Sequence, residues 1–351
     1  ALQVVLLLLG AVVVSVMAFD KVGGWDQVSA VTPDHMLSLI RPLDDPGMPW
    51  PTLILGVPLL GFYFWCNNQF MVQRVLSAKD ENHGRWGVLF AAALKLPVIF
   101  IMVFPGTMAR VLYPELPQAD LVYPTLLFDL LPAGLLGLVV AGFIAAVMSS
   151  LDSTLNSAST LVTMDFVRPM KPHLSEQQLL RIGRTSTFVF MILAALWAPQ
   201  IAHFDSLFKY LQGVLTYIAP PIVALFFLGV LWPRANAHGA FATLMVGLVL
   251  SLVHIAGRVM DASWLPGKVW PQLDHFLYVA PMLFVVSLFT HIVVSLATAA
   301  PDRERITPYM WTPALYREES QGLSRVAWFQ NYRILSLILV SVCAVLVYLY
   351  R

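Results

Sequence analysis

The sequence contains few charged residues. Only 12% of its 351 residues are Asp, Glu, Lys or Arg, whereas 58% are hydrophobic; soluble domains carry roughly 25% charged residues. A globule in water has to cover itself with polar surface, so a chain with a mean hydropathy of +0.75 cannot be one water-soluble core. We therefore predict an all-α membrane protein with lipid as the solvent for much of the chain.

Residues that build disulfide frameworks and metal centres are also scarce. The two cysteines, Cys66 and Cys343, lie in apolar segments, and the eight histidines are scattered without ligand spacing. No metalloprotease, nucleophile-elbow or phosphate-binding glycine motif occurs, so we predict that the chain is not an enzyme. Spacing alone leaves open a proteolytic pairing of Asp152 with a distant acid, although nothing positive supports it. A net charge of +1 argues against nucleic acid as a partner.

Long apolar runs dominate what is present, and their lengths predict about nine transmembrane helices. The chain opens inside such a run with no basic segment and no cleavage site, so we expect a helix already under way and not a signal peptide. A short surface helix is expected over residues 33–40, and the stretch 301–324 is the most polar loop. The predicted spans are residues 2–19, 51–76, 86–111, 131–163, 180–199, 207–232, 240–255, 276–297 and 329–350.

The distribution of Lys and Arg between the predicted loops indicates the orientation, because cytoplasmic loops carry an excess of both. With the N-terminus inside and the C-terminus outside, thirteen basic residues lie inside and seven outside. The inside set is Arg74, Lys79, Arg85, Arg168, Lys171, Arg181, Arg184, Arg234, Arg303, Arg305, Arg317, Arg325 and Arg333. The outside set is Lys21, Arg41, Arg110, Lys209, Arg258, Lys268 and Arg351.

Prolines lie at membrane depth in several predicted spans: Pro58, Pro97, Pro105 and the pair Pro220 and Pro221. Proline removes a backbone hydrogen bond and frees a carbonyl. Such carbonyls are tolerated where protein or a water-filled cavity satisfies them, as in the broken helices of transporters. Proline kinks also occur in membrane proteins that transport nothing.

Small hydroxyl residues recur along one predicted helix, between residues 149 and 163. Ala146, Ser149 and Ser150 share a face, since they lie at positions i, i+3 and i+4. Neutral oxygens on a small-residue face suit a weakly bound monovalent cation, but such residues also line tightly packed helix interfaces. Asp152 favours the functional interpretation, because an ionisable group at membrane depth is costly.

Lys95 is a second ionisable residue inside an apolar run. It lies about ten residues from the cytoplasmic end, which is about 15 Å at 1.5 Å per residue. One side chain does not reach that far by snorkelling. We therefore expect a polar cavity around Lys95.

Amides and aromatics form the third candidate cluster. Gly61, Phe64 and Asn68 lie at i, i+3 and i+7 on one helical face, and Phe208 precedes Gln212 by one turn. An aromatic ring beside an amide can hold a sugar by stacking and directed hydrogen bonds. Amides also bridge helices, and aromatics are ordinary in lipid-facing positions.

At these residues the sequence resembles the sodium/solute symporter family, most of all its sodium/glucose cotransporter branch. The resemblance covers most of the chain up to about residue 259 and is weaker beyond. The matching stretches are WCNNQFMVQRVLSAK (65–79), LKLPVIFIMVFPGTMARVLYP (94–114), residues 123–166 including AAVMSSLDSTLNSASTLVTMDF, and YLQGVLTYIAPPIVALFFLGVLW (210–232).

The resemblance implies the inverted-repeat (LeuT-type) transporter fold, with two five-helix bundles around a midplane site. Residues 1–260 would form the transporter core from its fifth to its tenth helix. Residues 261–351 would add three C-terminal transmembrane helices. Core helices one to four, which carry part of both binding sites, would then precede residue 1.

Sodium ligands follow from the same resemblance. Ala146, Ser149 and Ser150 match the family's main sodium site, where the alanine gives a carbonyl and the serines give hydroxyls. Ser149, Asp152 and Ser153 match a second sodium site present in some members. The resemblance therefore implies sodium as the coupling ion, at one or two sites.

The resemblance also implies the residues that would bind the solute. Lys95 and Gln212 match hydrogen-bonding positions for sugar, and Phe208 matches an outer-gate aromatic. Gly61 and Phe64 depart from sugar carriers, which place a polar residue and a tyrosine there. Asp152 is closer to polyol carriers, so the expected partner is a neutral sugar or polyol.

The predicted function is therefore sodium-coupled symport of a sugar or polyol across a cell membrane, in particular a bacterial inner membrane. Two alternatives stay open: sodium symport of another small solute, such as a carboxylate or an amino acid, and a membrane sensor in which a symporter-like domain reports solute to a signalling partner.

Overall fold

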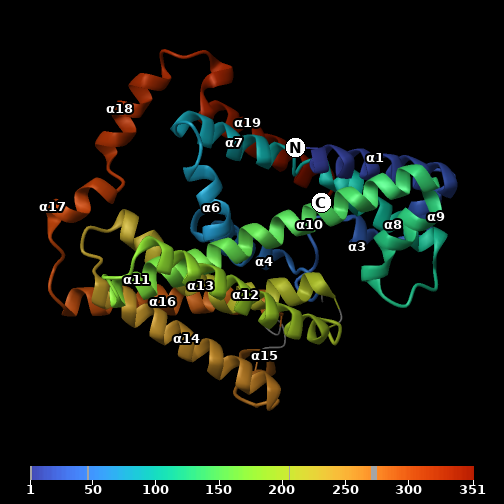
Figure 1. The fold of residues 1–351 in the computed structure, drawn as a ribbon. Helices are drawn as coiled ribbons and strands as arrows, with labels where there is room; N and C mark the ends of the chain where they lie inside the picture. The colour runs from blue at the N-terminus through green and yellow to red at the C-terminus, as the bar shows by residue number, and fades with distance from the viewer. Residues whose placement is uncertain (1, 46, 205, 270–274) are drawn as a thin grey trace. The chain divides into compact units, whose positions relative to one another are not determined.

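The computed structural model describes residues 2–45, 47–204, 206–269 and 275–351 (Figure 1). Across those ranges the chain is helical, and the backbone bridge between Arg41 and Pro49 is the one strand-like pairing. Two compact units form. Unit 1 comprises residues 1–34 and 91–210, and unit 2 comprises residues 35–90 and 211–351.

Most elements lie within one unit, whereas α3 (Asp34–Leu37), α7 (Glu81–Ala93) and α13 (Leu207–Leu231) cross a boundary. Unit 1 contains α1 (Leu2–Val22), α2 (Trp25–Val31), η2 (Ile99–Val103), α8 (Phe104–Leu112), η3 (Ala119–Leu121), α9 (Val122–Leu130), α10 (Ala133–Thr160), η4 (Leu161–Val167), α11 (Arg168–Met170) and α12 (Glu176–Ile201). Unit 2 contains α4 (Trp50–Leu55), α5 (Val57–Phe62), η1 (Tyr63–Asn67), α6 (Gln69–Leu76), α14 (Ala237–Val259), α15 (Pro266–Val269), η6 (Phe276–Tyr278), α16 (Val279–Ala297), α17 (Arg303–Ile306), η7 (Thr307–Tyr309), α18 (Pro313–Leu323), η8 (Trp328–Gln330) and α19 (Tyr332–Leu349).

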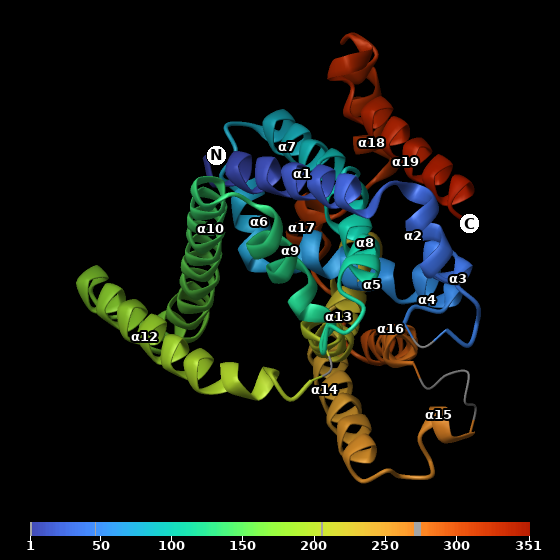
Figure 2. The ribbon, with the colours of Figure 1, turned by 90° about the vertical axis from the view of Figure 1, so that its right-hand side faces the viewer.

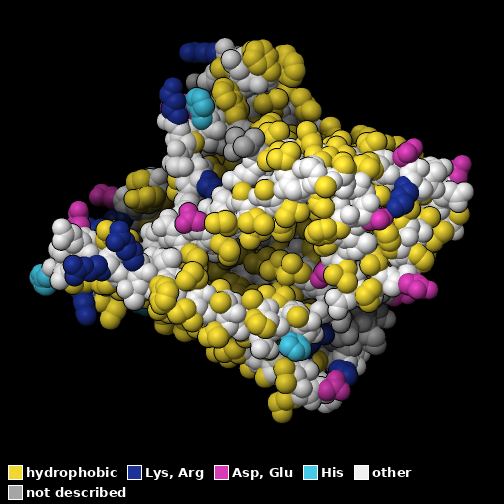
Figure 3. All heavy atoms as spheres, turned by 45° about the vertical axis from the view of Figure 1, so that its right-hand side comes forward, with side chains coloured by type: hydrophobic (Ala, Val, Ile, Leu, Met, Phe, Trp, Pro, Cys, Tyr) yellow, Lys and Arg dark blue, Asp and Glu magenta, His cyan; other side chains and the backbone are white. Residues whose placement is uncertain are grey.

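Seven helices in the described ranges are long and apolar enough to cross a membrane. They confirm seven of the predicted spans. Hydrophobic side chains cover much of the face shown in Figure 3, which suits lipid better than water. The seven are Gln3–Val22, Ala133–Met170, Glu176–Ile201, Leu207–Leu231, Ala237–Val259, Phe276–Ala297 and Tyr332–Leu349.

The other two predicted spans are not continuous helices. Over residues 51–76 the chain forms α4, α5, the π-helical turn η1 and α6. Over residues 86–111 the chain leaves α7 at Ala93, turns through residues 94–97 and resumes as η2 and α8. Pro58 and Pro105 each sit in the first turn of a helix, where proline's missing N–H costs nothing.

Pro220 and Pro221 do not interrupt their helix, since α13 continues through both. Both prolines are buried, and a Cβ added at Gly247 of α14 would lie 2.3 Å from Pro221 Cγ. The absence of a side chain at Gly247 thus makes room for the ring of Pro221. Packing against a neighbouring helix supports the proline-containing turn.

The polar stretch 301–324 is also more ordered than predicted, because it contains α17 and α18. The short helix expected over residues 33–40 appears as α3, and α2 precedes it.

The starts of two long helices follow from the local sequence. Ser175 and Gln178 form a capping box at the start of α12, and Asn236 caps α14.

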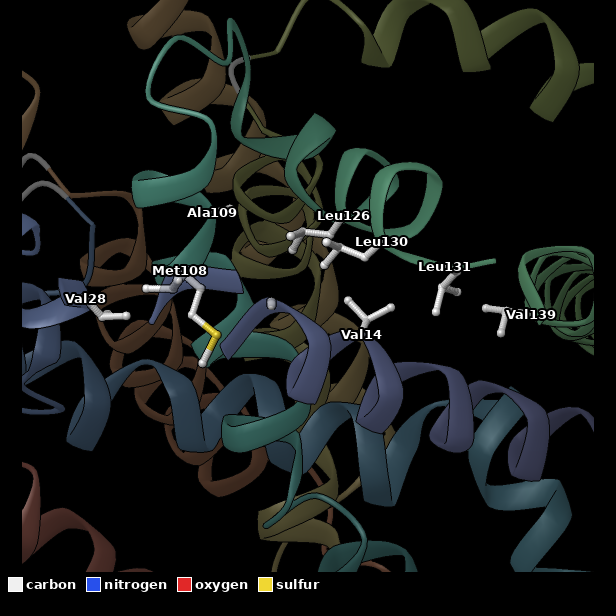
Figure 4. Packing of buried hydrophobic residues seen from close by; sticks show 10 residues of the cluster. Val14, Val28, Met108, Ala109, Leu126, Leu130, Leu131 and Val139 are labelled. Carbon is white, nitrogen blue, oxygen red and sulfur yellow. The ribbon is translucent and has the colours of Figure 1, made fainter. Parts of the chain in front are cut away.

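The core of unit 1 lies where α1, α8, α9 and the start of α10 converge (Figure 1). Val14, Met108, Leu126 and Val139 are buried there, each from a different helix (Figure 4). A Cβ on Gly10 would lie 2.5 Å from Val139 Cγ2, so glycine allows α1 to approach α10 closely.

Unit 2 is built around the close pair α14 and α16. Small residues form the contact: a Cβ on Gly239 would lie 2.1 Å from the Ser295 Oγ of α16, and the Thr243 hydroxyl lies 3.5 Å from Ser287 O of α16. Such small-residue faces let membrane helices pack by close backbone approach.

A charged cluster connects α18 and α19 to α7. The Glu319 carboxylate lies 2.6 Å from the Arg85 guanidinium and 2.5 Å from that of Arg333, and the Tyr332 hydroxyl donates to it. Partial burial by itself raises the pKa of the Glu319 carboxyl. The pKa is nevertheless lowered overall, because the hydrogen bonds from Tyr332 and Arg333 and the charges of Arg85 and Arg333 outweigh the effect of burial.

Candidate functional site

Helix α10 carries the predicted sodium ligands and positions them in unit 1. Ser149 and Ser150 are exposed, and their hydroxyls form no hydrogen bond to any described residue. The next hydroxyls along the helix, those of Ser153 and Thr154, donate to the carbonyls of Ser149 and Ser150 at 2.8 Å. The two serine hydroxyls are thus the ones left free for a ligand.

Ala146 and Ser150 also line one open hollow, of about 380 Å³, together with Leu7 of α1. Phe143 and Thr154 complete its polar and aromatic lining. In the hollow, Ala146, which would offer its backbone carbonyl, and Ser150, which has a free hydroxyl, lie one helical turn apart. It supplies neutral oxygens and no carboxylate, a donor set that suits a singly charged hard cation better than a divalent one.

Asp152 is exposed on α10, and Ser153 beside it is partly buried. Asp152 forms no ion pair within the described ranges. Its carboxylate therefore stays open to a cation, which is what the prediction of a second sodium site requires of it. In the same ranges, no group of three or more His, Cys, Asp or Glu gathers to hold a metal.

The predicted solute residues divide between the two units. Lys95 and Phe208 belong to unit 1, whereas Gly61, Phe64, Asn68 and Gln212 belong to unit 2.

Lys95 lies in the turn between α7 and η2, with its side chain exposed and without an ion pair to the described residues. The prediction of a lysine inside a continuous helix is wrong in this respect. Because the turn at Pro97 interrupts the helix, the Lys95 ammonium lies at a break, where backbone groups and a charge can share polar surroundings. Phe208, in the first turn of α13, is exposed.

In unit 2, a Cβ on Gly61 would meet no atom within 4 Å, so a solute could approach the α5 backbone there. Phe64 lies in the π-helical turn η1 and packs edge to face on Trp65, with ring centroids 5.5 Å apart. Gln212 is partly buried on α13, and its side chain has no partner among the described residues.

Asn68 has a structural role, because its side-chain oxygen accepts from the Phe70 N–H and caps α6. Asn67 is the residue that the helical pattern missed: both polar atoms of its side-chain amide are buried without a hydrogen-bond partner. Residues at i, i+3 and i+7 share a face only on an unbroken α-helix, whereas η1 widens the turn and changes which residues share a face. In the sequence, two adjacent asparagines inside an apolar segment could have indicated Asn67.

Apolar spanning helices together with helices interrupted at membrane depth are typical of the class of membrane transporters. Residues 1–247 match the family model described as the sodium:solute symporter family. The chain belongs to the sodium:solute symporter family. Symporters are transporters and not enzymes, as predicted.

Three relatives are about one-third identical to the chain. The sodium/myo-inositol cotransporter 2 of Sus scrofa is 34% identical over 356 residues, covering 89% of this chain and 52% of the relative. The sodium/glucose cotransporter 4 of Danio rerio is 34% identical, covering 89% and 54%. The sodium/mannose cotransporter of Bos taurus is 34% identical, covering 89% and 59%. The chain thus spans a little over half the length of these relatives.

A solved structure confirms the fold. It is a substrate-bound, outward-open Na⁺-coupled sialic acid symporter, which matches with a TM-score of 0.65 over 86% of this chain and 62% of the other. At 22% identity the likeness concerns the fold alone. It supports the predicted inverted-repeat architecture.

Proposed function

We propose that the protein containing this chain couples the downhill entry of Na⁺ to the uptake of a neutral sugar or polyol across a cell membrane. The observation that carries the proposal is the pair of unpartnered hydroxyls at Ser149 and Ser150 on α10, in a chain of this family. The relatives named for myo-inositol, glucose and mannose indicate the solute class.

In this mechanism, Na⁺ binds to the Ala146 carbonyl and the hydroxyls of Ser149 and Ser150 and stabilises the outward-open state. Solute then binds and the gates close. A second Na⁺ would use Ser149, Asp152 and Ser153. The family resemblance assigns hydrogen bonds with the solute to Lys95 in unit 1 and Gln212 in unit 2, an outer-gate role to Phe208 and a stacking role to Phe64. Gly61 and Asn68 are the further candidate solute positions in unit 2.

The sodium gradient is large enough to drive such uptake. A potential of 100 mV contributes about 2.3 kcal/mol per charge, and a tenfold Na⁺ gradient contributes about 1.4 kcal/mol. One Na⁺ then supports roughly several hundredfold accumulation of a neutral solute, and two would square that ratio.

Lys95 supports a second candidate solute class, because its exposed ammonium has no ion pair within the described ranges and could pair with a carboxylate. Labelled uptake by the full-length protein separates the candidates. We expect myo-inositol, glucose or mannose to accumulate in Na⁺ buffer and not in choline buffer. Equal uptake in both buffers would overturn symport. Competition by a carboxylate but not by these sugars would select the second candidate.

Two further assignments complete the proposal. Residues 1–260 would form the transporter core and residues 261–351 the additional C-terminal helices. A bacterial inner membrane is the predicted location, and fractionation of the source cells tests it.

A further inference from the structure

Unit 1 contains a second, larger groove, outside the predicted sodium and solute residues. It has a volume of about 650 Å³ and lies between the C-terminal end of α10 with η4 and the first turns of α12. Helix α12 crosses α10 in Figure 2, and the Ser159 hydroxyl donates to Gly183 O at 2.8 Å across that crossing. One part of the lining is polar, with Asn156, Thr163, Arg168 and Arg184, and another is apolar, with Leu179 and Leu180.

Thr163 indicates that the groove binds a ligand. Its side chain is only 6% exposed, yet its hydroxyl has no hydrogen-bond partner. Thr160 instead donates to the carbonyl of Asn156, four residues earlier. Thr163 lies in the π-helical turn η4, where the Arg168 N–H bonds to Thr163 O, five residues back. Leaving a buried donor unpaired is costly, and π-helical turns are frequent at functional sites.

The free donors in this groove favour an anion. The guanidinium groups of Arg168 and Arg184 form no hydrogen bond or ion pair to any described residue. Glu176 is the one carboxylate in the lining, and it is exposed. Outside the lining, Lys171 and Asp165 lie close by in the sequence and offset each other in charge. The lining therefore carries an excess of cations beside an unpaired hydroxyl.

Helix length and charge indicate that the groove lies at the level of lipid head groups. The continuous helix Ala133–Met170 has 38 residues, and at 1.5 Å per residue such a helix is about 57 Å long. A bilayer core is only about 30 Å thick, so part of the helix extends beyond the core. We place the end that carries Arg168 in the head-group layer, because a charged side chain is costly in the core. Met164 and Leu180 are 40% and 57% exposed and give the same groove an apolar wall.

We propose that this groove binds an acidic phospholipid from the leaflet at the Arg168 end of α10, which the distribution of basic residues predicts to be cytoplasmic. The phosphate accepts hydrogen bonds from Arg168, Arg184 and the Thr163 hydroxyl, and the Asn156 amide donates to the head group. An acyl chain packs on Leu180. Basic pockets between helices on the cytoplasmic side are suited to acidic head groups.

The test measures lipid retention by native mass spectrometry of the full-length protein, purified with phosphatidylglycerol and phosphatidylcholine. We expect bound phosphatidylglycerol in the unmodified protein, a loss of about fivefold in affinity for each of Arg168→Gln and Arg184→Gln, and about 25-fold for both together. Arg181→Gln, on the same helix but outside the lining, is the matched control and should retain the lipid. Equal retention by the double variant and the control overturns the proposal.

Thr163→Val provides a test that does not depend on charge. Valine keeps the shape of threonine but removes the unpaired hydroxyl, so the Tm in phosphatidylcholine alone should be unchanged or raised. The rise in Tm caused by added phosphatidylglycerol should shrink. An equal rise in variant and unmodified protein would remove Thr163 from the site. A rise produced by inorganic phosphate alone, with no preference for the lipid, would overturn the assignment to a phospholipid.

Discussion

At the scale of single residues, Ser150 distinguishes a sodium ligand from a helix-packing serine. Its hydroxyl has no partner among the described residues, whereas the hydroxyl of Ser157 donates to Ser153 O at 2.8 Å. Ser150→Ala should raise the Na⁺ concentration for half-maximal uptake about tenfold, because one oxygen ligand is lost. Ser157→Ala is the control and should leave that concentration unchanged. Equal behaviour of the two variants would remove Ser150 from the site.

Lys95 allows a residue-scale prediction on the solute side. Because its side chain is exposed and lies in a turn, Lys95→Ala should leave the stability within about 0.5 kcal/mol. It should raise the KM for solute about tenfold through the lost hydrogen bond. Steady-state uptake at saturating Na⁺ measures this. Lys79→Ala, another exposed lysine, serves as control; an unchanged KM for Lys95→Ala would contradict the assignment.

At the scale of helices, the pair α13 and α14 depends on Gly247. Gly247→Ala would place a Cβ 2.3 Å from Pro221 Cγ, and such overpacking should cost about 2 kcal/mol. Thermal unfolding in detergent should show a lower Tm. Gly229→Ala on α13 is the matched control, since a Cβ there meets nothing within 4 Å. A similar loss in both variants would mean that general helix effects, and not the proline contact, decide the stability.

The attachment of α18 and α19 to α7 should depend on pH through Glu319. The pKa of its carboxylate is lowered in the folded protein, so its stabilisation is fully present above the ordinary carboxyl pKa and is lost as the pH falls through the folded pKa. As the pH falls below the ordinary carboxyl pKa, Glu319→Gln should therefore flatten part of the fall in Tm. Glu318→Gln, the neighbouring exposed carboxylate, should not; identical profiles for the two variants would contradict the prediction.

At the scale of the whole molecule, nine membrane crossings should place the polar stretch 301–324 inside and Lys268 outside. In a background with Cys66 and Cys343 replaced by serine, Lys268→Cys should react with a membrane-impermeant maleimide from outside intact cells. Arg317→Cys should react only after the cells are opened. The reverse pattern would show that the orientation inferred from positive charges is wrong.

Interrupted helices mark the limit of prediction from sequence. Apolar length predicted the seven uninterrupted spans, since a bilayer demands about 20 apolar residues per helix. It did not reveal the breaks over residues 51–76 and 86–111. One break lies at Gly56, where a Cβ would be 2.7 Å from Leu277 O, a contact made by a residue distant in the chain.

The sequence by itself determined that this protein spans a lipid bilayer and that most of it is helical. It also determined which residues of α10 share a face, because hydrophobicity and helical period are local properties. Only the tertiary structure decided that the chain turns at Pro97 yet runs straight through Pro220 and Pro221. It also decided that Ser150 and Thr163 keep free hydroxyls. The reason is physical: the cost of a proline or an unpaired hydroxyl depends on the groups that packing brings beside it.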